Sequence, residues 1–288
     1  MSNRLRDQLD EGLVIAPGVW DGLTAVLAER AGFRTLCASG FAVSAALGYP
    51  DAELYTMSEN LEAVRRIREA SPLPLVADID TGYGNAVNAV RTARRFMDAG
   101  VEAVFMEDQE SPKRCPLTTD ATLPLLDTAT AALKVRAVKD TVGDRVLVIA
   151  RTDARGDEAL ARAAAYVEAG ADLIMPVTKT FSTVEEWAKC HAEVGVPLMA
   201  TLTASAWTER EFTPEVMREI GVGLALLPTQ LLMSVAGAAE RTLARLARGD
   251  APAEVGTDEG AMPHATFVDV IGTDEVERLQ HAYLPASA

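Results

Sequence analysis

Cysteine and histidine are scarce in this chain, which has 288 residues but only three of each. Cys37, Cys115 and Cys190 are too few and too scattered for a disulfide framework or a zinc cluster. The three histidines are too dispersed for a metal triad. Any metal site in this protein is therefore expected to use oxygen ligands.

Basic residues are outnumbered, with 27 Lys and Arg against 42 Asp and Glu and a net charge of −15. This balance argues against a nucleic-acid partner, whose binding surface would be basic. No apolar run approaches the roughly 20 residues needed to span a bilayer. The start, Met1–Asp7, lacks the apolar core of a secretory signal. We therefore expect a soluble cytoplasmic protein without a membrane partner.

One unit recurs along the chain, in which a short apolar run is followed by an amphipathic helical pattern. Eight runs are predicted as strands: Leu13–Ala16, Thr35–Ala38, Leu73–Asp78, Ala103–Met106, Val146–Ala150, Asp172–Met175, Pro197–Ala200 and Gly223–Leu227. Predicted helices between them include Leu61–Ala70, Ala89–Ala99, Ala159–Ala169 and Val184–Val194. Eight such βα units predict a TIM (β/α)8 barrel.

Glycine also recurs just past the helical patterns, at Gly32, Gly100, Gly170, Gly195 and Gly221. Glycine in that position ends a helix in the left-handed conformation and starts the next strand. Most of the strand runs are continuously apolar, as parallel strands covered on both faces are. A doubly wound open sheet is the competing fold, but no Gly-x-Gly-x-x-Gly follows the first strand.

Two segments lie outside this repeat. Gln109–Leu126 is polar, contains proline and is long for a βα loop, so we predict a lid there. Gly249–Pro263 is predicted as a linker between a barrel domain at 1–248 and a C-terminal helical segment at 264–288. That segment, helical over Ala265–Tyr283, would cap the barrel bottom or pack on a neighbouring subunit.

The run Asp78–Asn85 places two carboxylates, Asp78 and Asp80, at the end of a predicted buried strand and the start of a Gly-rich loop. Residues two apart on a strand point to the same side. Two like charges held close, with no Lys or Arg adjacent in sequence, usually need a cation. The alternative for an isolated Asp-x-Asp is one helix cap and one solvated carboxylate.

Polar side chains also follow the other predicted strands, where barrel enzymes build their sites. The set is Trp20, Asp21, Ser39, Gly40, Asp78, Asp80, Glu107, Asp108, Arg151, Asp153, Thr201, Thr229 and Gln230. Each has a structural alternative: Asp21 would cap a helix, Asp153 would cap or pair with Arg155, and Arg151 would pair with Glu107. Together they predict a site for a small acid coordinated through Mg²⁺.

Cys115 is the candidate acid–base group. It lies in the predicted lid after Lys113 and Arg114, whose charges would favour its thiolate. A thiol that arrives on loop closure can exchange a proton with a carbon acid or an enolate. The alternative is an incidental loop cysteine beside two solvated cations.

Several runs together resemble the isocitrate lyase/phosphoenolpyruvate mutase superfamily. They are Ser39-Gly40, Leu47–Asp51, Asp78–Asn85, Met106–Gln109, Pro112–Cys115 and Ile149–Ala154. The resemblance is strong from Val14 to Ala154 and continues more weakly, in strand order, to the C-terminus.

The resemblance implies a TIM barrel whose last helix is swapped between partners, giving dimers and usually homotetramers. It implies Mg²⁺, with Mn²⁺ as an alternative, bound by Asp80 together with Asp78 and Glu107. Arg151 would hold an oxyanion. Cys115 would be the acid–base of the lyase branch, and Lys113 and Glu107 complete the expected catalytic set.

The substrate implied by the resemblance is a small carboxylate. Ser39 and the backbone N–H groups of Gly40 and Phe41 would hold its carboxylate group. Asp51 would act at the same site, directly or through water, and Thr201 occupies the end of the seventh strand.

The sequence departs from the lyase pattern at several positions. Pro116-Leu117 follows the lid cysteine in place of Gly-His, Val177 follows Pro176 in place of Glu, and Thr201 replaces Asn. Cys37 and Phe41 also differ from the pattern. These changes remove polar contacts to a tricarboxylate, so a smaller or alkyl-bearing 2-hydroxy or 2-keto acid is expected.

The leading hypothesis is a Mg²⁺-dependent carbon–carbon lyase acting on such an acid through an enolate. A phosphonomutase is the closest alternative, and an oxaloacetate decarboxylase is a third. A non-catalytic ligand-binding barrel is the non-enzyme alternative. Asp78, Asp80, Glu107, Arg151 and Cys115 argue against it, since a scaffold has no physical need for that cluster of charge.

Overall fold

The computed structural model describes residues 3–119, 122–203, 206–256 and 260–284. The chain divides into two compact units, Met1–Leu232 and Met233–Ala288. None of the helices in the described ranges is long and apolar enough to cross a membrane.

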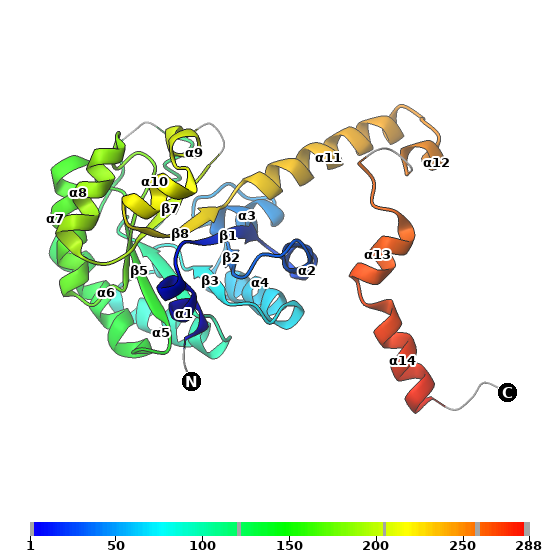
Figure 1. Cartoon of the computed structure of the whole chain (residues 1–288), viewed down its shortest axis with the longest axis horizontal. Coiled ribbons are helices and arrows are strands. Elements are labelled where there is room, and N and C mark those ends of the chain that lie inside the picture. The colour runs from blue at the N-terminus through cyan, green and yellow to red at the C-terminus, as the bar shows by residue number, and fades with distance from the viewer. Residues whose placement is uncertain (1–2, 120–121, 204–205, 257–259, 285–288) are drawn as a thin grey trace. The chain divides into compact units, whose positions relative to one another are not determined.

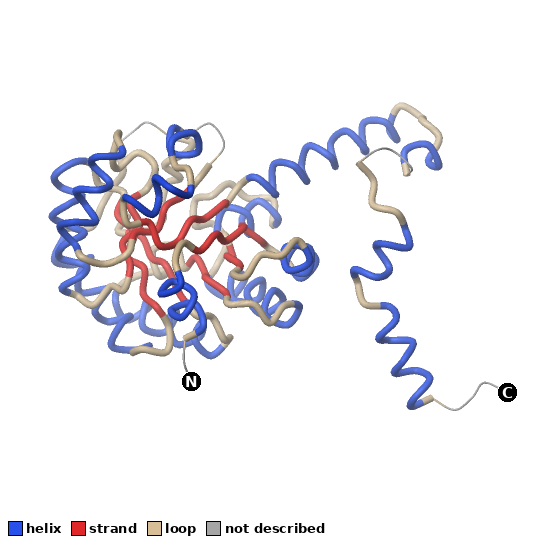
Figure 2. Tube along the Cα trace, in the orientation of Figure 1, coloured by secondary structure: helices blue, strands red, loops and turns tan. Residues whose placement is uncertain are grey.

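The first unit is a closed barrel of eight parallel strands surrounded by helices (Figures 1 and 2). The strands are β1 (Val14–Val19), β2 (Leu36–Ala38), β3 (Leu75–Asp78), β4 (Ala103–Glu107), β5 (Leu147–Thr152), β6 (Leu173–Pro176), β7 (Leu198–Thr201) and β8 (Val222–Leu227). They pair in sequence order, and β1 pairs with β8 to close the sheet. The predicted (β/α)8 barrel is therefore confirmed.

The helices of this unit alternate with the strands. They are α1 (Arg4–Glu11), α2 (Gly22–Arg30), α3 (Gly40–Ala46), α4 (Met57–Ala70), α5 (Ala86–Asp98), α6 (Thr128–Val142), α7 (Gly156–Glu168), α8 (Val184–Val194), α9 (Trp207–Glu211) and α10 (Pro214–Glu219). α11 (Gln230–Ala247) begins in the first unit and continues into the second.

Local sequence explains where the helices begin and end. Capping boxes start α4 at Thr56, α5 at Asn85 and α8 at Thr183, and each such cap stabilises a helix by about 1 kcal/mol. The five glycines expected after helices all have positive φ, which confirms that prediction. They are Gly32, Gly100, Gly170, Gly195 and Gly221.

Apolar side chains pack in two layers. One buried cluster lies inside the barrel and includes Cys37, Phe105 and Met175, with Leu5 of α1 among its members. The larger cluster lies between the strands and the outer helices and includes Phe96 and Trp187. Because both faces of the sheet are buried, the strands can be continuously apolar.

Several strands extend beyond the predicted runs, because their polar terminal residues still pair in the sheet. β4 ends at Glu107, which pairs with Arg151 of β5, and β5 continues to Thr152. β7 likewise ends at Thr201. The predicted apolar runs stopped short here, since a functional side chain at a strand end interrupts the hydrophobic pattern.

The second unit, Met233–Ala288, is helical in its described part. It contains most of α11, then α12 (Pro252–Val255), α13 (His264–Val270) and α14 (Thr273–Tyr283). The last segment, expected as one helical piece, is two helices, because Gly272 has φ 74° between them. Residues 257–259 of the expected linker and 285–288 lie outside the described ranges, and the exchange of this segment between partners stays a prediction.

Candidate active site

The turn after β3 brings Asp78 and Asp80 together at the mouth of the barrel. Asp78 is the last residue of the strand, and Asp80 has φ 48° in the turn and is 0% exposed. The Asp80 N–H donates to Asp78 Oδ1 at 2.9 Å, and the Gly40 N–H donates to Asp78 Oδ2 at 3.2 Å. The position of Asp80 is therefore set by the turn. The two-residue spacing had suggested that Asp78 and Asp80 lie on one side of a strand, but the strand ends at Asp78.

Two side chains that the sequence analysis missed fix this turn. Tyr83 Oη donates to Asp80 Oδ2 at 2.6 Å. Asn60 Nδ2, from α4, donates to Tyr83 Oη at 2.8 Å and to the Asp78 carbonyl at 2.7 Å. Asn60 is fully buried among the apolar residues of α4. A buried-face asparagine on an amphipathic helix was the available signal.

Glu107 and Arg151 form an ion pair at the ends of β4 and β5, as the structural alternative for Arg151 predicted. Glu107 Oε2 lies 2.6 Å from Arg151 Nη1. Burial would lower the pKa of Arg151, but Asp153 and Glu107 outweigh it and raise that pKa. Burial also raises the pKa of Glu107, and Arg151 and Lys113 do not offset it. Asp153 pairs with Arg151 at 3.0 Å, and not with Arg155 as the structural alternative predicted.

Two other carboxylates at strand ends serve the scaffold. Asp21 caps α2 by accepting a hydrogen bond from the Thr24 N–H at 2.8 Å, as the structural alternative predicted. Asp108 accepts hydrogen bonds from Tyr166 Oη at 2.7 Å and Thr152 Oγ1 at 2.8 Å. Neither residue lines the cavity at the barrel mouth described below.

Lys113 reaches from the loop after β4 into the carboxylates. Its Nζ lies 2.7 Å from Asp80 Oδ1, 2.9 Å from Asp51 Oδ1 and 3.6 Å from Glu107 Oε1. Burial would lower the pKa of Lys113, but Asp80, Glu107 and Asp51 raise it well above its usual value. Asp78 and Asp80 have no Lys or Arg adjacent in sequence, and the fold brings Lys113 to them from 33 residues downstream of Asp80.

Cys115 is buried beside this cluster, with 5% of its surface exposed. Burial first, and then the charge of Asp51, raises the pKa of its thiol to about 11. The expectation that Lys113 and Arg114 favour a thiolate was therefore wrong. Lys113 is engaged by carboxylates, and Arg114 is exposed. The group in this structure is a thiol, which is the proton-donating form.

A cavity of about 50 Å³ lies between these groups. Asp78, Lys113, Arg151 and Cys115 line it, together with four of the expected substrate-binding residues. Those four are Ser39, Phe41, Asp51 and Thr201. The fifth, Gly40, directs its N–H to Asp78, and a Cβ there would lie 2.5 Å from Asp78 Oδ2.

The opposite side of this cavity carries hydroxyl groups. Thr178 follows β6, Thr201 ends β7 and Thr229 follows β8, and all three line the cavity. Their Oγ1 atoms are buried without a hydrogen-bond partner in the described part of the chain. Leaving such groups unpaired costs about 1–3 kcal/mol each. They are therefore positioned to bind a polar group that the protein does not itself provide. Sequence reasoning named Thr201 and Thr229 and missed Thr178.

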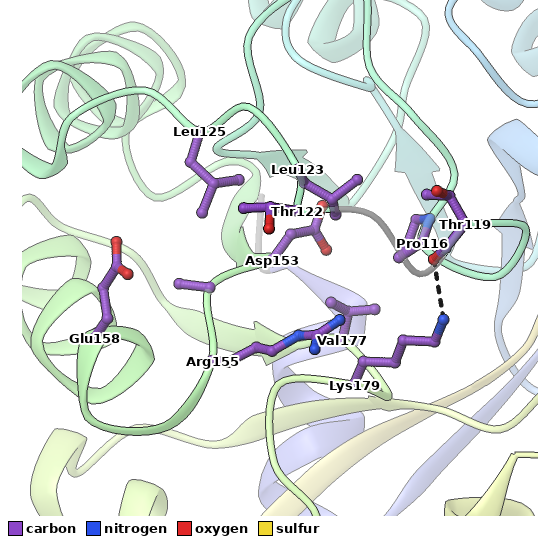
Figure 3. A pocket seen from close by; sticks show the side chains of 11 residues that line it. Pro116, Thr119, Thr122, Leu123, Leu125, Asp153, Arg155, Glu158, Val177 and Lys179 are labelled. Carbon is purple, nitrogen blue, oxygen red and sulfur yellow. Dashed lines mark hydrogen bonds between the residues drawn. The ribbon is translucent and has the colours of Figure 1, made fainter.

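A second cavity, of about 210 Å³, adjoins the first (Figure 3). Pro116 and Val177 line both cavities. Arg155 and Lys179 line the larger one, and Lys179 Nζ donates to the Thr119 carbonyl of the predicted lid at 3.0 Å. Pro116 and Val177 therefore stand between the two cavities.

The donor set fits a hard divalent cation. Asp51 Oδ1, Asp80 Oδ1 and Glu107 Oε1 are buried and lack a properly directed hydrogen bond in the described ranges. Carboxylate oxygens are the ligands that Mg²⁺ prefers. As arranged, no three His, Cys, Asp or Glu side chains of the described residues stand ready to hold a metal ion. Lys113 Nζ lies among the oxygens that would do so.

Comparison with protein families matches residues 5–247 to the phosphoenolpyruvate phosphomutase family. Among curated proteins, 2-methylisocitrate lyase of Bacillus subtilis is 37% identical over 78% of this chain and 74% of its own length. The 2,3-dimethylmalate lyase of Eubacterium barkeri is 32% identical over 94% of this chain and 93% of its own length.

Solved structures give the same assignment. A phosphoenolpyruvate phosphomutase from Streptomyces platensis superposes with a TM-score of 0.89 at 28% identity, covering 99% of this chain and 100% of that one. Phosphonopyruvate hydrolase in complex with oxalate and Mg²⁺ gives a TM-score of 0.85 at 30% identity, covering 99% and 100%.

Proposed function

The chain belongs to the phosphoenolpyruvate phosphomutase family, and from that premise we propose that it is a Mg²⁺-dependent carbon–carbon lyase acting on a small 2-hydroxy acid. The observation that carries the proposal is the position of Cys115, whose buried side chain lines the same 50 Å³ cavity as Arg151, Asp51 and Asp78. The relatives at 37% and 32% identity are lyases, which supports this branch of the family.

The charged side of the cavity would bind the 2-hydroxy acid end of the substrate. A divalent cation held by Asp80, Asp78 and Glu107 would polarise the oxygens of that end. Arg151, fixed between Glu107 and Asp153, would stabilise negative charge that develops on a substrate oxygen.

The proposed reaction breaks the bond between C2 and C3 of the acid. The hydroxyl proton at C2 passes to a carboxylate of the site, and C2 becomes a carbonyl carbon. The electron pair of the broken bond stays on C3 of the leaving half. Cys115 Sγ then donates its proton to that carbon. A thiol with a pKa of about 11 holds its proton at neutral pH, as this role requires.

The hydroxyl side of the cavity would hold the leaving half of the substrate. Thr178, Thr201 and Thr229 can each donate one hydrogen bond to its oxygen atoms. Phe41, Leu117, Met175, Val177 and Leu226 line the rest of the cavity and suit an alkyl-bearing chain. We therefore propose an alkyl-substituted malate-like substrate in preference to a tricarboxylate.

Release of a 2-keto acid from a panel of acids tests this function. The panel contains 2-methylisocitrate, 2,3-dimethylmalate, other alkylmalates, oxaloacetate and phosphonopyruvate, the last followed by ³¹P NMR. We expect turnover of an alkylmalate, loss of that turnover on chelation and its return on adding Mg²⁺. Turnover confined to phosphonopyruvate would contradict the lyase proposal.

Cleavage of a phosphorus–carbon bond is the second candidate. It is favoured by the family match and by the likeness to phosphonopyruvate hydrolase over nearly the whole chain. This chemistry makes no demand on Cys115 as a proton donor. The ³¹P measurement and a Cys115 variant therefore separate the two candidates.

A further inference from the structure

Glu53 is one of three non-glycine residues with positive φ in the described part of the chain. The other two, Asp80 and Tyr83, belong to the turn after β3 that forms part of the site. Glu53 has φ 52° in the short turn between α3 and α4. Such a conformation in a non-glycine residue persists only where the surrounding contacts impose it, and it is concentrated at functional sites. The side chain of Glu53 is therefore expected to hold something that the site needs.

The two carboxylate oxygens of Glu53 hold two different segments. Oε1 accepts a hydrogen bond from Thr81 Oγ1 at 2.5 Å. Oε2 accepts from Ser111 Oγ at 2.7 Å and from the Lys113 N–H at 3.3 Å. Glu53 itself is not among the described residues that line either cavity. One carboxylate outside the cavities thus joins the turn after β3 to the loop after β4.

Thr81 is the fixed end of this link. It follows Asp80 and is 0% exposed. Lys134 Nζ, from α6, donates to the Thr81 carbonyl at 2.5 Å and to the Gly84 carbonyl at 3.0 Å. The turn is therefore held from the outer helices as well as from within the site. A side chain that bonds to Thr81, as Glu53 does, is anchored to the barrel.

The other end of the link is the segment Ser111–Cys115, which carries the candidate proton donor. Lys113 Nζ reaches the carboxylates of the site at the end of a flexible four-carbon chain, which by itself leaves the main chain free to shift. Gln109 bonds to the Arg114 N–H at 2.9 Å and to the Arg114 carbonyl at 3.0 Å. The main chain of the segment is thus held at two points, by Glu53 at Lys113 and by Gln109 at Arg114.

We propose that Glu53 is a positioning residue that anchors the segment Ser111–Cys115 to the turn after β3, and that this anchor holds the Cys115 thiol in the cavity. The inference rests on the proposed function, since it takes Cys115 as the proton donor. A carboxylate suits the task, because its two oxygens can accept several hydrogen bonds and an ionised acceptor binds its donors more strongly. Loss of Glu53 would let the segment open more often and would place the thiol less accurately when it is closed.

Alkylation of the cysteines by iodoacetamide tests the anchor without substrate. The labelling rate of a buried cysteine follows the population of the open form. Glu53→Gly removes the carboxylate and introduces the residue that best tolerates positive φ. We expect it to speed labelling of Cys115 by at least about tenfold, measured by mass spectrometry of the digested protein. Cys37 of β2 and Cys190 of α8, both 0% exposed, are the internal reference and should label as in the wild type.

Two further variants show whether the effect comes from this contact. Glu110→Ala is the control, because Glu110 is an exposed glutamate of the same loop, and it should label like the wild type. Ser111→Ala removes one of the hydrogen bonds to Glu53 and should speed labelling of Cys115 about fivefold. In the Glu53→Gly background the same change should add nothing, since its partner is already gone.

Turnover connects the anchor to the reaction. We expect kcat of Glu53→Gly for the preferred alkylmalate to fall about tenfold, because a misplaced proton donor transfers its proton less efficiently. Binding of oxalate in the presence of Mg²⁺ should stay that of the wild type. Arg151 and Asp80 keep their contacts with Glu107 and Tyr83 in this variant, so the acid end would still bind.

The outcomes distinguish this inference from the proposed function. Labelling of Cys115 in Glu53→Gly at the wild-type rate overturns the anchor and leaves the lyase proposal standing. Equal acceleration at all three cysteines also overturns it, because the variant would then have loosened the whole barrel. Selective labelling of Cys115 with unchanged turnover supports the anchor and overturns the assignment of Cys115 as the proton donor.

Discussion

The two sides of the barrel mouth differ in whether their buried polar groups have partners within the protein. On the side of β3 to β5, carboxylates and cations lie within ion-pair distance of one another, as in Glu107 with Arg151. On the side of β6 to β8, the hydroxyls of Thr178, Thr201 and Thr229 are buried without partners in the described ranges. Both cations among the described residues that line the cavity, Lys113 and Arg151, belong to the charged side.

The contrast indicates a different role for each side of the mouth. An unpaired buried charge costs far more than an unpaired hydroxyl, so charges must be compensated before any ligand arrives. The charged side therefore compensates its carboxylates with Lys113 and Arg151. An unpaired buried hydroxyl costs less, so the neutral side can keep hydroxyls without protein partners and use them to bind the variable half of a substrate.

Asp80→Ala should have the largest effect and should act on every substrate. It removes a fully buried carboxylate from the proposed cation site, and we expect turnover to fall by at least about 10³-fold, as for loss of a catalytic metal's ligand. Keto acid release and calorimetric Mg²⁺ binding measure the two losses. Unchanged turnover would break the assignment of this side to the cation.

Cys115→Ser should come next, with a loss of roughly 10²–10⁴-fold in turnover, the range for removing a general acid. Binding of oxalate in the presence of Mg²⁺ should be preserved, because oxalate engages the charged side alone. If turnover survives and oxalate binding is intact, Cys115 is not the proton donor and phosphorus–carbon chemistry gains support.

Valine at Thr178, Thr201 or Thr229 should have a smaller effect that is confined to the neutral side. Each change removes one hydrogen bond, worth about 1 kcal/mol, and should raise the KM of the preferred acid about fivefold. Affinity for oxalate should stay that of the wild type. If affinity for oxalate fell as much as affinity for the full substrate, the assignment of separate roles to the two sides would be wrong.

The smallest effect expected is on the pH dependence of stability in EDTA. The pKa of Asp78 is about 7 in the fold and ~3.9 in an unfolded chain. Between about pH 4 and pH 7 the folded state holds a proton that the unfolded chain releases, so this contribution to stability falls as pH rises. Thermal unfolding of Asp78→Asn should show a shallower decline over that window. If stability declined with pH as steeply in Asp78→Asn as in the wild type, Asp78 would not be the group responsible for the decline.

The barrel and the charged strand ends could be predicted because they depend on local pattern. Continuous apolar runs and glycine after each helix specify the βα units, and polar residues after the runs mark the mouth. Asp78, Glu107 and Arg151 lie at or next to strand ends, as this reasoning predicted, and Asp80 lies in the turn after β3.

What could not be predicted depends on contacts between distant segments. Lys113 forms an ion pair with Asp51, which lies 62 residues earlier in the chain, and the sequence around neither residue predicts this pair. The protonation of Cys115 was misjudged for the same reason. Its sequence neighbours are basic, but folding directs Lys113 to carboxylates and buries the thiol beside Asp51.

The buried, protonated thiol of Cys115 also has a consequence for inhibitor design. Electrophilic warheads react with thiolates, and a thiol with a pKa of about 11 and 5% exposure offers them little. Selective inhibitors of this protein would therefore be reversible analogues of the acid substrate that occupy both sides of the cavity. A covalent probe would therefore label Cys115 slowly as long as its side chain stays buried.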